Sequence, residues 1–182
     1  TNAWTYAATS GTQNITTQSG SGINNVGSVI FNGGASADLL SFPASSTAYN
    51  LNGTSWTVEC WIYPKSAQMD ILVTNSTGAG NWALVMSNNI YWQNGWGNIN
   101  LVYSTGFITQ NSWNHIAIVR IGTGTNNMKM YVNGTQVSQS SSAQAFSYTG
   151  SQSIGKALTG NGYYFTGYIS NFRIVNGTAL YT

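Results

Sequence analysis

Residues 113–137 read WNHIAIVRIGTGTNNMKMYVNGTQV, and this stretch decides the fold class. Residues 115–121 form an apolar run with only two polar members, and residues 128–132 (MKMYV) follow after a loop of Gly, Thr and Asn. The Asn-Gly pair at 133–134 favours the positive φ angles that a type I′ hairpin turn requires. A short apolar run without alternation is typical of a strand buried on both faces, so the stretch predicts a layered sheet in a sandwich or barrel.

The rest of the chain continues as short strands separated by polar turns. Further strands are expected at residues 29–31, 39–42, 56–63, 71–74, 82–86, 90–92, 99–103, 154–155 and 163–175. In residues 56–63 (WTVECWIY), the even-numbered side chains share one face and the odd-numbered ones share the other. No segment of ten or more residues shows helical periodicity. The sequence therefore predicts an all-β protein, an antiparallel sandwich of two sheets.

The length of 182 residues suits a single domain with a substantial core. Residues 1–27 are polar and rich in Gly, Ser and Thr, which predicts an irregular N-terminal arm that can include an edge strand. Residues 28–182 are expected to form the sandwich domain.

Charge is scarce, because charged residues make up 4% of the chain against a typical value of about 25%. The net charge is +2 and the Lys and Arg residues are not clustered, which argues against a nucleic-acid partner. The sequence contains no run of 18 apolar residues, so membrane insertion is not expected. A surface of uncharged amides and hydroxyls suits an extracellular or virion-exposed protein. Cys60 is the only cysteine, so no disulfide can form within the chain, and a buried thiol is expected.

Several phrases of the sequence resemble a known family when taken together. They are SVIFN at 28–32 followed by Gly33, WTVECWIYP at 56–64, WNHIAIVR at 113–120, MYVNG at 130–134 and FTGYISNFRIVNGTALYT at 165–182. In this order they resemble the laminin-G-like group of the concanavalin A-like lectin/glucanase superfamily, in the versions found in phage and bacterial surface proteins. The resemblance implies a jelly-roll sandwich of two antiparallel sheets and a binding module, often for carbohydrate. Because these phrases are mostly framework, they say little about the ligand.

Carboxylates are too few for the chemistry of a glycosidase, which needs two of them beside the scissile bond. The chain holds Asp38, Glu59 and Asp70 alone. Glucanases of the resembled fold carry a Glu-x-Asp-x-x-Glu cluster on one strand, where this chain offers only Glu59. We therefore expect no enzyme, and a framework role for Glu59 in a hydrogen bond with Arg120 or Arg173.

A metal site has little support in the sequence. His115 is the only histidine, at a position where the resembled family places one, and it is expected to be a structural residue at a strand end. One His and one Cys cannot complete a zinc site. Many relatives in the family bind calcium through oxygen ligands, and Asp38 or Asp70 is the candidate carboxylate for a weak site. No cofactor is expected, with calcium as the alternative.

Aromatic residues in polar segments are the strongest functional signal. Residues 88–100 read NNIYWQNGWGNIN and residues 161–165 read NGYYF. Flat rings cover the apolar face of a sugar while amides donate and accept hydrogen bonds, which suits a neutral glycan. The alternative is that these rings pack in the core or at its rim. The candidate ligand-binding residues are Trp92, Asn94, Trp96, Asn161, Tyr163 and Tyr164.

Three functions remain open at this point. The first is a non-catalytic adhesion module that recognises carbohydrate or a cell-surface polysaccharide from a virion or cell surface, as in a phage fibre or decoration protein. Many copies, or a homo-oligomer, would strengthen weak individual sites. The second is a structural domain that contacts other virion proteins without a glycan, and a glycoside hydrolase is the least favoured.

Overall fold

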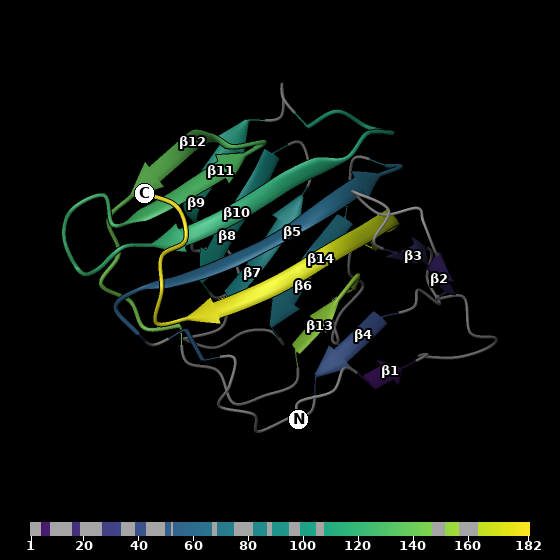
Figure 1. Cartoon of the computed structure of the whole chain (residues 1–182), viewed down its shortest axis with the longest axis horizontal. Helices are drawn as coiled ribbons and strands as arrows, with labels where there is room; N and C mark the ends of the chain where they lie inside the picture. Colours follow the sequence, from purple (N-terminus) through teal and green to yellow (C-terminus); the bar gives the residue numbers. More distant parts are fainter. Residues whose placement is uncertain are drawn as a thin grey trace.

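A computed structural model describes thirteen segments of the chain and, within them, an all-β protein. These segments are residues 5–7, 16–18, 27–33, 39–42, 50–51, 53–66, 69–74, 82–86, 89–94, 99–104, 108–146, 152–156 and 164–182. Their strands form two seven-stranded antiparallel sheets that face each other (Figure 1). The described part contains no helix that is long and apolar enough to cross a membrane. The predicted antiparallel sandwich is confirmed.

The strand order places the two long central strands, β5 and β14, side by side in one sheet. This front sheet runs β12 (Thr135–Ser140), β11 (Met128–Val132), β10 (Asn114–Arg120), β5 (Trp56–Pro64), β14 (Thr166–Asn176), β3 (Ser28–Asn32) and β2 (Thr16–Gln18). The back sheet runs β1 (Thr5–Ala7), β4 (Leu39–Phe42), β13 (Gln152–Ile154), β6 (Met69–Thr74), β7 (Trp82–Met86), β8 (Asn89–Asn94) and β9 (Ile99–Ser104).

The stretch that decides the fold class forms β10, β11 and β12, as the sequence predicts. Asn133 and Gly134 have φ angles of 50° and 80°, and Val132 pairs with Thr135 across them, so the two-residue turn has the two positive φ angles of type I′. β10 pairs with β5 over seven residues and is buried along nearly its whole length. The apolar run therefore lies in the interior of a layered sheet.

The core between the sheets is built around large aromatic rings, which we call the inner cluster: Trp56, Trp82, Trp92 and Phe146. Each ring is at most 1% exposed. Trp82 and Trp92 stack with centroids 4.8 Å apart, and Trp56 lies 5.3 Å from Trp92. Phe146 meets Trp56 edge-on at 5.6 Å. Burial of a ring of this size contributes about 1.5–3 kcal/mol, so this cluster is a major part of the stability.

A β-bulge in β14 determines which of its side chains point away from the core. Ser170 pairs with Trp61 and Arg173 pairs with Glu59, so β14 uses one residue more than β5 over this interval. Asn171 takes up the extra residue with a φ of 50°, a conformation that Asn tolerates well. The bulge shifts the alternation, so that Arg173 faces outward beside Glu59.

Gly167 is required where β14 passes β5. Its φ is +144°, and a Cβ at this position would lie 2.0 Å from the carbonyl oxygen of Tyr63. The sequence predicts a bend or bulge at this glycine; the bulge itself comes at Asn171, four residues later.

The described residues of the N-terminal arm form an edge strand on each sheet. β1 pairs with β4 of the back sheet and β2 pairs with β3 of the front sheet. An edge strand in this arm agrees with the sequence, and the second one adds to it. The division into an arm of residues 1–27 and a domain of residues 28–182 stays a prediction.

The last six residues, 177–182, form a segment that we call the C-terminal strap. It turns back from the end of β14 over the outer face of the front sheet (Figure 1, yellow). The hydroxyl of Thr57 donates to the Thr178 carbonyl at 3.1 Å and accepts from the Leu180 N–H at 3.0 Å. The strap thereby covers one half of that face, where Thr57 and Val119 are fully buried.

Candidate functional site

The other half of the outer face carries four large rings, which we call the aromatic face: Trp61, Tyr63, Trp113 and Tyr168. All four are partly exposed. Trp61 and Tyr63 are odd-numbered positions of β5 and so point away from the inner cluster. Tyr168 pairs directly with Tyr63, and antiparallel partners present their side chains on the same face.

Three rings of the aromatic face are in mutual contact, and the fourth, Trp61, packs against His115. Tyr63 lies 5.6 Å from the ring centroids of both Trp113 and Tyr168, and those two are 6.4 Å apart. Trp61 packs against the His115 ring with centroids 5.1 Å apart. The result is a compact apolar surface on the outside of the sheet.

Polar groups border this surface at the end of β5. The Lys65 ammonium lies 4.9 Å from the centroid of the Tyr168 ring. The Asn111 N–H donates to the Pro64 carbonyl at 2.9 Å, which holds the loop before Trp113 against the end of β5. Lys65 and Asn111 are both exposed. The aromatic face therefore lies between this polar rim and the strap.

Glu59 lies between the strap and the aromatic face and is held by three neighbours. Its Oε2 accepts hydrogen bonds from the Tyr181 hydroxyl at 2.6 Å and from His115 Nε2 at 3.1 Å. Its Oε1 accepts from Arg173 Nε at 2.5 Å. Because a carboxylate only accepts, His115 must carry a proton on Nε2.

The charge state of Glu59 follows from these contacts. Burial would raise the pKa of this carboxyl, but the hydrogen bonds from His115, Tyr181 and Arg173 outweigh burial and lower the pKa to about 2. Glu59 is therefore ionised at neutral pH and holds no proton to donate. Its expected framework role is confirmed with Arg173 as the partner, while Arg120 instead donates to the carbonyls of Gly122 and Gln144.

Two of the residues predicted to bind a ligand lie in the interior. Trp92 is the central ring of the inner cluster and is 0% exposed, and Asn94 is 2% exposed. The expectation that these two side chains contact a ligand is wrong, because β8 continues to Asn94 and its even-numbered residues face the core. For Trp92, packing is the interpretation that the structure supports.

Most of the remaining predicted residues lie outside the part of the chain that the structure describes. Trp96, Asn161, Tyr163 and Asp38 lie outside the described residues, and Asp70 is placed only by its backbone, in β6. Tyr164 is half-buried, with the Lys156 ammonium 5.3 Å from its ring centroid. No three of His, Cys, Asp and Glu gather into a metal site within the described segments. The calcium site stays a prediction.

The aromatic face does not follow from the sequence pattern that predicts ligand-binding rings, because that pattern selects rings in polar loops. Its members lie in framework phrases: WTVECWIYP, WNHIAIVR and GYISN. A signal was present in the first of these, since its alternation places Trp61 and Tyr63 opposite to Trp56. Two large rings on the second face of a central strand are unusual for a solvated sheet surface.

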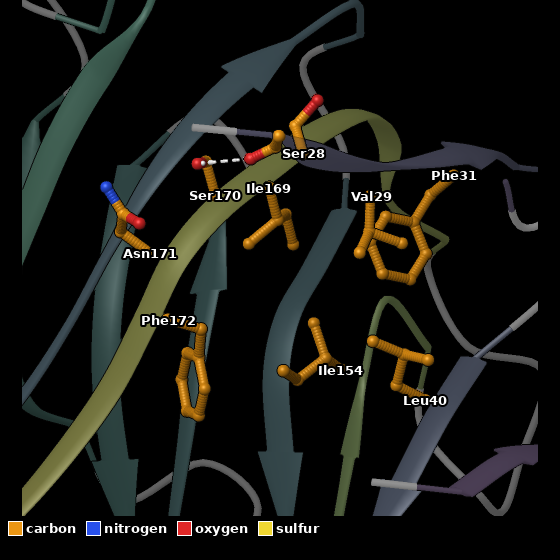
Figure 2. Close-up of a pocket in the computed structure, with 10 residues that line it drawn as sticks. Ser28, Val29, Phe31, Leu40, Ile154, Ile169, Ser170, Asn171 and Phe172 are labelled. Carbon is orange, nitrogen blue, oxygen red and sulfur yellow. Dashed lines mark hydrogen bonds between the residues drawn. The ribbon is translucent and has the colours of Figure 1, made fainter. Parts of the chain in front are cut away.

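A separate apolar cleft of about 270 Å³ opens beside the β14 bulge (Figure 2). Its walls come from both sheets and are mainly the side chains Val29, Phe31, Leu40, Ile154, Ile169 and Phe172. At its rim the Ser170 hydroxyl donates to the Gly27 carbonyl at 2.9 Å. The polar side chains of its lining are Ser28, Ser170 and Asn171, and its walls offer no group of exposed flat rings, so the aromatic face is the better candidate for carbohydrate.

Solved structures with the same architecture come from several kinds of protein. Domain 4 of AbnA, an extracellular arabinanase from Geobacillus stearothermophilus solved in complex with arabinotriose, is 16% identical and aligns over 97% of this chain and 83% of that chain, with a TM-score of 0.71. The binding domain of Paraclostridial Mosquitocidal Protein 1 is 16% identical over 97% of this chain and 45% of that chain, with a TM-score of 0.69. The enzymatically active domain of tailspike protein 2 from bacteriophage CBA120 is 14% identical over 96% of this chain and 29% of that chain, with a TM-score of 0.62.

At these identities the structural likeness shows the fold alone, and this chain spans less than half of the latter two proteins. A comparison with curated proteins gave no match. The sequence itself matches a laminin G-type family model, described as the concanavalin A-like lectin/glucanases superfamily, over residues 32–180. The two-sheet architecture and this match agree, and the chain belongs to the laminin G-like family of the concanavalin A-like lectin/glucanases superfamily.

Proposed function

We propose that this protein is a non-catalytic carbohydrate-binding module, displayed outside the cell or on a virion, and that the aromatic face is its binding surface. One observation carries the proposal: Trp61, Tyr63, Trp113 and Tyr168 gather, partly exposed, on the outer side of a sheet. Sugar rings present apolar C–H faces that pack on aromatic rings. Apolar surface left open on one side of a soluble domain commonly marks a place where something binds.

Polar groups around the rings can form hydrogen bonds with the hydroxyls of a sugar. The hydroxyls of Tyr63 and Tyr168, together with exposed Asn111, offer donors and acceptors next to the apolar surface. A few polar groups beside a mainly apolar surface are typical of small-molecule and sugar sites. Individual sites of this kind bind weakly, so display in many copies or as a homo-oligomer would raise the avidity.

The absence of catalysis in this proposal rests on the state of Glu59. It is the acid nearest to the aromatic face among the described residues, and it is ionised and engaged by three hydrogen-bond donors. Asp70 belongs to β6 of the other sheet. Glycoside hydrolysis needs an acid and a second carboxylate across the scissile bond, and the described residues of this face do not supply such a pair.

The relatives add support of a general kind. One of the structures with this fold is a domain solved in complex with arabinotriose, and another is a binding domain. The low charge of the chain, 4% of residues, also suits a surface exposed to variable salt. A phage fibre or decoration protein is the setting that we propose, with a polysaccharide of the host surface as partner.

A glycan array tests the proposal with a matched pair of variants. Tyr168→Ala removes a ring from the aromatic face, and Tyr91→Ala removes a half-buried tyrosine from the outer side of the back sheet. We expect the first variant to lose glycan binding and the second to retain it. Binding that is equal in both variants would contradict the choice of the aromatic face.

A protein partner is the second candidate, because aromatic rings at a half-buried surface are also typical of protein interfaces. If the aromatic face joins two copies of this chain, Trp113→Ala will lower the molar mass measured by light scattering during size-exclusion chromatography. A monomer of unchanged mass in both proteins, together with glycan binding by the parent, would exclude the interface.

A further inference from the structure

The cationic side chains of this protein are few, and the structure places all of them. They are Lys65, Arg120, Lys129, Lys156 and Arg173. Arg120 and Lys156 are buried and cannot meet a ligand at the surface. The other cations all belong to the front sheet or its rim, and two of these, Lys65 and Arg173, border the aromatic face.

These two cations differ in how their charge is compensated. The Arg173 side chain, although 55% exposed, is bound to Glu59 through Nε and Nη2, so its charge is met by a carboxylate. Lys65 makes no ion pair within the described residues, since both ion pairs found there involve Glu59. No carboxylate side chain that the structure describes therefore meets the charge of Lys65 at the rim of the ring cluster.

The position of Lys65 is fixed by the backbone and by a ring. Its N–H donates to the Thr166 carbonyl at 2.8 Å, which extends the pairing of β5 with β14 past Pro64. Its ammonium lies over Tyr168, 4.9 Å from the ring centroid. A cation held against an aromatic ring keeps its remaining N–H donors for an anion, and a hydrogen bond between two charged groups is among the strongest available.

We infer that the glycan bound by the aromatic face is acidic, with its carboxylate paired to Lys65 and its sugar rings packed on Trp113 and Tyr168. This inference rests on the proposed function and narrows its ligand to sugars that carry a carboxylate. In a protein with so few charges, one ammonium that no described carboxylate meets, beside an apolar surface, distinguishes an acidic sugar from its neutral counterpart. The sequence alone favoured a neutral glycan, because it did not reveal where the cations lie.

The test is an array of matched acidic and neutral glycans, including oligogalacturonides with their methyl esters and sialylated glycans with their desialylated forms. We expect the acidic member of a pair to bind about tenfold more tightly at low salt. The preference should shrink as ionic strength rises, because an exposed pair is screened. Lys65→Gln should bring the two members of the pair to equal affinity while binding of the neutral member persists.

Lys129→Gln is the matched control, since it removes the same charge from β11 of the same sheet. Lys129 pairs with Val119, four residues along β10 from His115, and so lies away from the rim. We expect this variant to keep the acidic preference. If both lysine variants lost the acidic preference equally, net charge alone would explain it and the assignment to Lys65 would be overturned.

The outcomes separate the inference from the function on which it rests. Binding of neutral glycans only, abolished by Trp113→Ala, would overturn the acidic ligand and leave the carbohydrate module standing. Binding of no glycan in either class would count against both.

Discussion

Strand β5 offers two faces made by the same short sequence, and they serve opposite purposes. Its inner face contributes Trp56 and Cys60 to a core in which both are at most 1% exposed. Its outer face contributes Glu59, under the strap, and then Trp61 and Tyr63, which stay partly exposed. Strand parity, rather than residue type, therefore decides whether an aromatic ring in this protein stabilises the fold or is available to a ligand.

The largest expected loss of stability comes from a substitution in the inner cluster. Trp92→Ala should lower the free energy of unfolding by about 3–5 kcal/mol, because it leaves a cavity amid Trp56, Trp82 and Phe146. Urea unfolding followed by circular dichroism measures the change. A loss below about 1 kcal/mol would mean that Trp92 is not the central core ring, and the distinction between the two faces would fail.

A somewhat smaller effect is expected at Glu59, on the outer face. Glu59→Gln should cost about 2–4 kcal/mol of stability at pH 7, because it removes the charge that accepts from Arg173, Tyr181 and His115.

The pH dependence of Glu59 sharpens this prediction. Its folded pKa of about 2 lies below the ordinary value of 4.5, so the stabilisation is complete above about pH 4.5 and is lost as the pH falls towards 2. Unfolding curves at several pH values should show that fall in the parent protein and a flatter profile in Glu59→Gln. Identical profiles would show that the pKa of Glu59 is the same in the folded and unfolded states, which would contradict the prediction.

A substitution in the aromatic face should weaken binding and leave stability nearly unchanged, which is the opposite of a substitution in the inner cluster. Trp113→Ala should weaken glycan binding about tenfold or more while changing the free energy of unfolding by about 1 kcal/mol. Isothermal titration calorimetry with the best glycan from the array measures the first quantity, and urea unfolding measures the second. A stability loss as large as that of Trp92→Ala would place Trp113 in the framework instead.

The smallest effect concerns Cys60, the inner neighbour of Glu59. Burial, and secondarily the Glu59 charge, raise the pKa of its thiol to about 12, so almost no thiolate exists at pH 8. The native protein should therefore leave a thiol reagent such as DTNB unreacted and release one equivalent of product only in denaturant. Rapid reaction of the native protein would mean that the inner face of β5 opens readily.

The architecture could be predicted from the sequence because the patterns that specify it are local. The Asn-Gly pair before Thr135 has a single good geometry, and the alternation of residues 56–63 specifies which side chains face the core. The bulge at Asn171 was not predictable, since its effect, the pairing of Arg173 with Glu59, depends on a partner strand more than a hundred residues away.

The site was predicted less well, for a physical reason. The polar composition around Trp92 suggested a ligand-binding ring, whereas β8 continues to Asn94 and buries that ring. The aromatic face depends on strand pairing between β5 and β14 and on the strap leaving half of the sheet uncovered. Those are relations between distant segments, which a search for loop motifs does not detect.

The most direct test of the central claim follows the seven tryptophan indole N–H signals by NMR while glycan is added. The account predicts that the signals of Trp61 and Trp113, identified by single substitutions to Phe, shift on binding while those of Trp56, Trp82 and Trp92 do not. Shifts at the three inner indoles with Trp61 and Trp113 unchanged would contradict the assignment of binding to the outer face of the front sheet.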